Sequence, residues 1–189
     1  MRYGEYLKCA YKHLKSCELL LNAYTPGSNY DLWIWLDLYY LSGYVIEGIV
    51  VYSAYKCYGW REDRDIQYGY DLEFTKLTGL DFYYKRTIQD EDSEAYSYFN
   101  KRIGRDVKSV QGHKFQPIVH DLLHKNPSFN GIPYIGDGYI DEDVQQLIED
   151  WTPKVRYEYQ EANNHSLSKD VISRLIDTCY AIYNQTHLI

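Results

Sequence analysis

The chain has 189 residues, a formal net charge of −7 at pH 7 and a sequence pI near 5.3. This length predicts one medium domain that is large enough for a proper hydrophobic core. The excess of acidic residues argues against nonspecific nucleic-acid binding by the whole surface, but it leaves room for a local basic groove. The polar N-terminal segment lacks the pattern of a signal peptide, so we expect a cytoplasmic protein.

Cysteine and tyrosine usage adds two expectations. The cysteines form no C-x-x-C pair and sit in apolar helical patterns, so we expect free, buried thiols at Cys9, Cys17, Cys57 and Cys179. The 23 tyrosines can bury their rings while keeping hydroxyls for hydrogen bonds, so the predicted core contains many polar tips. Some of these rings are candidates for stacking on nucleic-acid bases, although packing explains most of them.

The first predicted element is a helix from Tyr3 to Tyr24. Apolar side chains recur at three- and four-residue steps, which places them on one face. They are Tyr6, Ala10, His13, Leu14, Cys17, Leu20 and Leu21. The turn-forming segment 25–29 (TPGSN) ends this helix, and Asp31 is a candidate cap for the next one. Because the loop is short, the two helices should pack antiparallel.

The longest apolar run, Trp33 to Tyr58, has two interpretations. A membrane span needs about 18 or more apolar residues with few charges, but Asp37, Glu47 and Lys56 interrupt this run. The other interpretation is a central bundle helix that is buried by neighbours on several sides. We favour the central helix and expect no membrane association. Glycines at positions 43 and 48 cost helix propensity, so either another helix approaches closely there or the cost is simply tolerated.

The region from about residue 61 to 110 breaks the helical pattern. It is charged and aromatic, and we interpret it as an irregular insertion. Within it, Asp81–Lys85 is a candidate strand and Glu91–Lys108 a candidate helix. A third core helix is expected to start at Gly112-His113 and to run to about His124, with a proline in its first turn.

The C-terminal part predicts two further helices after a loop over residues 126–138. Asp141 caps a short acidic helix that runs to Trp151, and Ser168 caps the last helix. The sequence therefore predicts one all-α domain over residues 1–189. Its architecture is an antiparallel up-and-down bundle of four or five helices, with the insertion between the second and third core helices.

Three stretches, taken in order, resemble the HEPN domain family of helical bundles, which are often found beside minimal nucleotidyltransferases. The first is Tyr40–Glu47, which resembles the small-aromatic-x-x-Glu run of that family's second helix. The second is Gly112–Phe115, which resembles the start of its third helix but has Lys-Phe where Asp-Leu is usual. The third is Trp151 followed by Arg156-Tyr157, before the last helix. The resemblance covers about residues 3–59 and 112–187.

The resemblance implies a bundle that is often a homodimer and is associated with nucleotides, RNA or a nucleotidyltransferase partner, including in toxin–antitoxin pairs. Many members are metal-independent ribonucleases with an Arg-x(4–6)-His motif. Here the nearest pair, Arg156 and His165, has eight residues between its members. We therefore expect a binding module that is not an enzyme and needs no cofactor. The alternative is a divergent ribonuclease in which His165 acts as base and Arg156 holds the phosphate.

The expected ligand site is the cleft where the family-like positions converge. It comprises Glu47, His113, Arg156 and Tyr157. Arg105 and Lys108 belong to a small basic stripe that is the best local candidate for phosphate contact. A plainer interpretation is that Arg156 pins its turn through a carboxylate, for which Glu47 is a candidate.

Two weaker alternatives remain for the function of this chain. His120 and His124 have the i, i+4 spacing of helical zinc ligands, but no third ligand is evident nearby, so we expect no catalytic metal. The last alternative is a scaffold protein without a small ligand, which would bind a protein partner through the insertion at 61–110.

Overall fold

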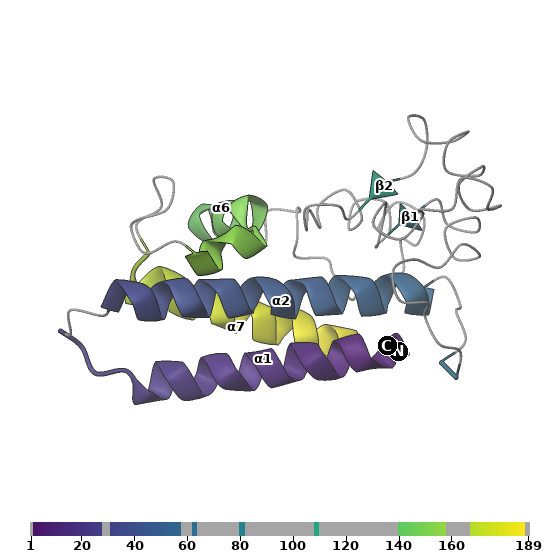
Figure 1. Ribbon diagram of the computed structural model, residues 1–189, viewed down its shortest axis with the longest axis horizontal. Helices are drawn as coiled ribbons and strands as arrows, with labels where there is room; N and C mark the ends of the chain where they lie inside the picture. The colour runs from purple at the N-terminus through teal and green to yellow at the C-terminus, as the bar shows by residue number, and fades with distance from the viewer. Residues whose placement is uncertain are drawn as a thin grey trace.

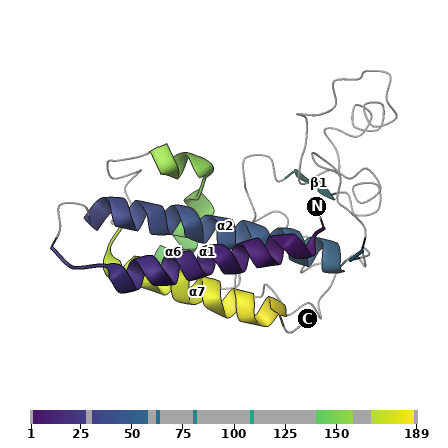
Figure 2. The same cartoon turned by 60° about the horizontal axis from the view of Figure 1, so that its bottom comes forward.

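The computed structural model describes residues 2–27, 31–57, 62–63, 80–81, 108–109, 140–157 and 167–187. Two long helices, α1 (Gly4–Ala23) and α2 (Asp31–Cys57), lie side by side and run antiparallel, as Figures 1 and 2 show. The loop between them turns at Gly27, whose φ of +86° is readily adopted only by glycine. The carboxylate of Asp31 accepts hydrogen bonds from the Tyr24 hydroxyl at 2.8 Å and from the Gly27 N–H at 3.3 Å, which ties this loop to the start of α2.

The helix α2 is the centre of the core. Most of its turns contribute fully buried side chains, among them Leu38, Val45, Ile49, Val50 and Ala54. The span Asp31–Lys56 is long and apolar enough to cross a membrane by length and composition, but 67% of its apolar window is buried inside the protein. The helix therefore fits the interpretation as a bundle centre with neighbours on several sides.

The two glycines of α2 meet different neighbours. A Cβ on Gly48 would lie 2.8 Å from the carbonyl oxygen of Tyr6 and 3.1 Å from the Cβ of Ala10, so close approach of α1 is confirmed there. A Cβ on Gly43 would overlap the indole of Trp151. At that position the close neighbour is the side chain of Trp151, the residue that caps the end of α6.

The short helix α6 (Glu142–Asp150) and the 3-10 helix η1 (Pro153–Tyr157) follow one another along the chain, and α6 lies over the first half of α2 (Figure 1). The predicted cap is confirmed, because the Asp141 carboxylate accepts the Val144 N–H at 3.1 Å. The hydroxyl of Tyr39 donates to the carbonyl of Leu147 at 2.7 Å in the buried contact between α2 and α6.

The last helix, α7 (Lys169–His187), packs against both α1 and α2. Its predicted cap is also confirmed, because the Ser168 hydroxyl accepts the Val171 N–H at 3.4 Å. The beginning of α7 lies near the end of α1, and Tyr183 near the end of α7 packs against Tyr11 of α1, so the two helices run antiparallel (Figure 1). This order of directions is the one expected for the first, second and last helices of an up-and-down bundle.

The predicted all-α class is confirmed, with four α-helices among the residues that the structure describes. In the insertion, the structure gives β1 (Leu80–Asp81) and β2 (Lys108–Ser109), which pair in parallel. Lys108 thus lies in an extended segment, and its placement at the end of a helix was wrong. The predicted third core helix and most of the insertion lie outside the described residues.

Two thiols are buried as expected, and one is not. Cys17 and Cys179 are fully buried, and both lie near Ser42, at 4.0 Å from its hydroxyl and 3.8 Å from its carbonyl, respectively. Cys9 is exposed, so its predicted burial was wrong. The reason is its position one residue before Ala10, just off the buried face of α1. The side chain of Cys57 lies outside the described residues.

Candidate functional site

Tyr44 in the middle of α2 is the centre of an aromatic cluster drawn from three parts of the chain. Its ring meets the edge of the Trp151 ring at 5.2 Å between centroids and that of Tyr40 at 4.9 Å. The His13 ring of α1 lies 5.8 Å away. Trp151 is 3% exposed and sits over Gly43, where a larger residue would exclude its indole. Because Gly43 has no side chain, the Trp151 indole packs directly on α2 and anchors the segment between α6 and η1 there.

Arg156 and Tyr157, at the end of η1, form an exposed cation–aromatic pair. The guanidinium carbon lies 4.5 Å from the centroid of the Tyr157 ring, and the guanidinium donates a hydrogen bond to the Tyr157 hydroxyl. The Tyr157 side chain is 67% exposed. The hydrogen bond to Tyr157, followed by one to Tyr40, raises the pKa of Arg156 further above its usual range. The pair therefore presents a permanent positive charge and an open ring face to solvent.

The Tyr44 phenol lies under the electrostatic influence of both Arg156 and Glu47. The Tyr40 and Tyr44 hydroxyls are 3.5 Å apart. Burial is the main cause that raises the pKa of Tyr44, followed by Tyr40 and then by the charge of Glu47, while Arg156 acts in the opposite direction. Glu47 and Arg156, 109 positions apart in the sequence, thus act on one phenol. At neutral pH that phenol stays protonated and is a hydrogen-bond donor.

A hollow of about 190 Å³ lies between α1 and α2 beside this cluster. The described residues that line it are Tyr6, Cys9, His13, Tyr44, Glu47 and Gly48. His13 is half-buried, and burial, together with Lys12, lowers its pKa. Its imidazole is therefore neutral at pH 7, and it can both donate and accept a hydrogen bond.

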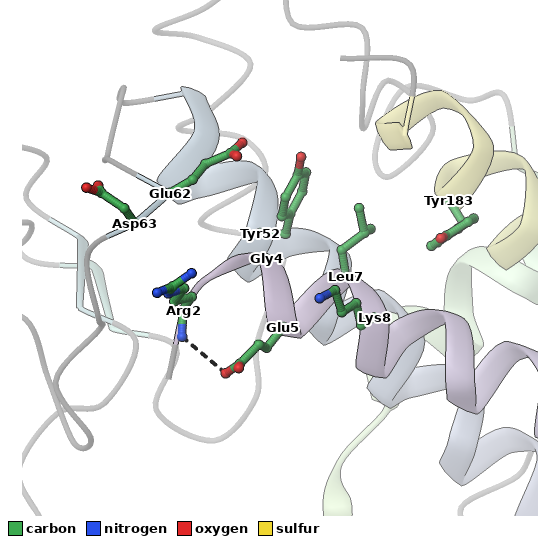
Figure 3. Close-up of a pocket in the computed structure, with 9 residues that line it drawn as sticks. All are labelled: Arg2, Gly4, Glu5, Leu7, Lys8, Tyr52, Glu62, Asp63 and Tyr183. Atoms are coloured by element: carbon green, nitrogen blue, oxygen red, sulfur yellow. Dashed lines mark hydrogen bonds between the residues drawn. The ribbon is translucent and has the colours of Figure 1, made fainter.

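A larger hollow of about 630 Å³ lies where the beginning of α1 meets the end of α2 and Tyr183 of α7 (Figure 3). Its lining mixes bases and acids: Arg2, Lys8, Glu5, Glu62 and Asp63. Two of the acids are already engaged, because Glu5 accepts the Arg2 N–H at 3.1 Å and Glu62 pairs with Lys56 at 2.9 Å. This mixture gives no preference for a ligand of either charge.

Of the predicted site residues, Arg156 and Tyr157 contact each other beside Tyr40, and the charges of Glu47 and Arg156 both act on Tyr44. Lys108 is described only as part of β2. The remaining candidates lie outside the described residues: Arg105, His113, His120, His124 and His165. Among the residues that the structure describes, no group of three His, Cys, Asp or Glu side chains is placed to hold a metal ion.

No sequence pattern assigned a site role to His13, Tyr40, Tyr44 or Trp151. A signal for His13 was present, because it lies on the apolar stripe of the first helix, where an ionisable ring must face the central helix. Tyr40 and Tyr44 lie inside the family-like run that ends at Glu47, four residues apart and therefore on one face.

Comparisons with known proteins add no relative. No protein-family model, no curated protein and no solved structure matches this chain.

Proposed function

We propose that this chain is a HEPN-like helical module of the cytoplasm that binds RNA or a nucleotide without cleaving it. The observation that carries the proposal is the exposed pair of Arg156 and Tyr157 beside Tyr40. A planar cation beside an open aromatic ring offers a contact for a phosphate and a platform for a base. Stacking on an aromatic ring contributes about 1–3 kcal/mol per base and does not depend on the sequence.

The electrostatics of the chain support a local site. A net charge of −7 disfavours contacts over the whole surface, so affinity must come from few cations. Within the described residues, the groups that contact Arg156 belong to tyrosines and not to carboxylates, so its charge remains available to a phosphate. The basic stripe with Arg105 and Lys108, together with His113, is proposed to extend the site. A homodimer, or a complex with a nucleotidyltransferase, follows only from the family resemblance.

The test is a gel with end-labelled structured RNA in EDTA, run native and denaturing. The wild type is expected to shift the RNA and leave it intact. Arg156→Ala and Tyr157→Ala are expected to weaken the shift at least about fivefold, the effect of losing one stacked base. The matched control is Lys154→Ala, which removes an exposed cation from the same 3-10 helix and is expected to change little.

Three outcomes contradict the proposal. Cleavage by the wild type that His165→Ala abolishes would make the protein a ribonuclease with an unusual Arg–His spacing. A shift that Arg156→Ala and Tyr157→Ala leave unchanged would mean that the RNA contacts another surface. Absence of both shift and cleavage, with mononucleotides also failing to bind, would favour a protein partner and turn attention to the insertion at 61–110.

A further inference from the structure

The larger hollow, where α1 begins and α2 ends, has the size of a small-molecule site. Its volume of about 630 Å³ falls within the range of roughly 300–1,000 Å³ that is typical of such sites. Part of its wall is apolar, because it is lined by the buried side chain of Leu7 and by the half-buried ring of Tyr52, which packs against Tyr3 (Figure 3). An occupant can therefore cover an apolar group there.

Two cations at the edge of this hollow have no ion pair. Arg2 and Lys8 both line it and are exposed. The hydrogen bond between Arg2 and Glu5 uses the backbone N–H of Arg2 and leaves its guanidinium unengaged (Figure 3). No carboxylate of the described residues pairs with the side chain of Arg2 or Lys8. Both cations are therefore available to the carboxylate of a ligand, for which a guanidinium has the matching geometry.

The acids of the hollow are not equivalent. Glu62 is held by Lys56 at 2.9 Å, and this contact lowers the pKa of its carboxyl. Glu5 accepts the Arg2 N–H through Oε2 alone, and no cation of the described residues forms an ion pair with it. Since a carboxylate can accept about four hydrogen bonds, Glu5 keeps acceptor sites for an ammonium group.

The order of these charges matches a ligand that carries both signs side by side. Arg2, Glu5 and Lys8 are three positions apart, so the acid lies between the two cations along one flank of the beginning of α1. We propose that the larger hollow binds a small zwitterion of the α-amino-acid class. Its carboxylate contacts Arg2 and Lys8, its ammonium contacts Glu5, and its apolar side chain packs against Leu7 and Tyr52. This site goes beyond the proposed RNA or nucleotide site, which depends on η1.

Three compounds that share a phenyl ring separate the two charges. Phenylalanine carries both, hydrocinnamate carries only the carboxylate, and phenethylamine carries only the ammonium. Heteronuclear NMR of the isotope-labelled protein follows the amide signal of Gly4, which lines the hollow. We expect phenylalanine to shift this signal saturably, with a Kd at least about tenfold lower than that of either compound with a single charge.

Variants assign this binding to the named side chains. The double variant Arg2→Gln, Lys8→Gln is expected to bind phenylalanine no better than phenethylamine, because nothing then holds the carboxylate. Glu5→Gln still accepts the Arg2 N–H and is expected to bind phenylalanine no better than hydrocinnamate. Lys12→Gln, which changes an exposed cation of α1 outside the described lining, is the control and is expected to bind as the wild type does. Circular dichroism verifies that each variant is folded.

Three results would overturn the proposal. They are no saturable shift of the Gly4 signal, equal affinity for phenylalanine and one of the compounds with a single charge, or unchanged affinity in both the double variant and Glu5→Gln. Arg156→Ala separates this site from η1. Retained binding of phenylalanine by Arg156→Ala supports a separate site, and loss of that binding would contradict this inference.

Discussion

Arg156 and Arg174 differ in the side chains that contact them. Arg174 contacts three carboxylates, those of Asp141 at 2.6 Å, Asp143 at 3.1 Å and Asp170 at 3.2 Å. Arg156 contacts the hydroxyl and ring of Tyr157. The carboxylates neutralise the Arg174 guanidinium and hold it between α6 and α7. Tyr157 holds the Arg156 guanidinium in place without neutralising its charge. The comparison indicates that Arg174 joins two elements of the fold and that Arg156 is available to a ligand.

The largest expected effect comes from Trp151, which holds the segment between α6 and η1 onto α2. Trp151→Ala removes a nearly fully buried indole above Gly43 and is expected to cost about 3–5 kcal/mol in free energy of unfolding. Urea denaturation measures this change. Trp151→Phe, which keeps a ring, is the control and is expected to cost less. A cost below about 1 kcal/mol for Trp151→Ala would mean that this segment is not anchored by its indole.

The second prediction tests the two arginines directly. Arg174→Ala is expected to lower the thermal midpoint and leave the RNA shift unchanged. The reason is that the carboxylates of Asp141 and Asp143 at the start of α6 would lose the cation that they share. Arg156→Ala is expected to leave the thermal midpoint nearly unchanged and to weaken the RNA shift. Differential scanning calorimetry and the native gel provide the two measurements. If both variants lose stability equally and both still shift RNA, the distinction between the arginines is false.

The smallest expected effect is the pH dependence contributed by His13. Its folded-state pKa lies below the ordinary value of 6.5, mainly because burial disfavours the imidazolium. The unfolded chain therefore takes up the proton first, so His13 costs stability as the pH falls below 6.5. His13→Gln is expected to flatten the decline in unfolding free energy between about pH 7 and pH 5 relative to wild type. A parallel decline in both proteins would show that other groups cause it.

Much of the fold was predictable from local patterns. The helical steps of the first, central and last helices describe a single face or a fully apolar surface, and caps are recognised by residue type alone. Asp141 and Ser168 were predicted as caps for that reason, and both accept the expected N–H. Trp33 shows the limit of an apolar pattern, because it belongs to the run of α2 and is still 52% exposed. Periodicity gives the direction of a side chain but not what covers it.

The candidate site was predictable only in part. Glu47 and Arg156 were expected to meet, and both act on Tyr44. Glu47 and Arg156 are 109 positions apart in the chain, and both act on one phenol because η1 packs against α2. No local pattern contains that information. The role of Trp151 opposite Gly43 is hidden for the same reason. A glycine in a helix signals that something approaches, but its identity comes from tertiary packing.

The contact at Gly48 makes the spacing of α1 and α2 depend on the absence of one methyl group. Long helices behave as stiff rods, so a wedge inserted at this point would separate them over several turns rather than locally. Gly48→Ala would therefore change the volume of the hollow beside it without altering any other residue that lines it. The backbone approach at Gly48 thus sets how much space lies between α1 and α2.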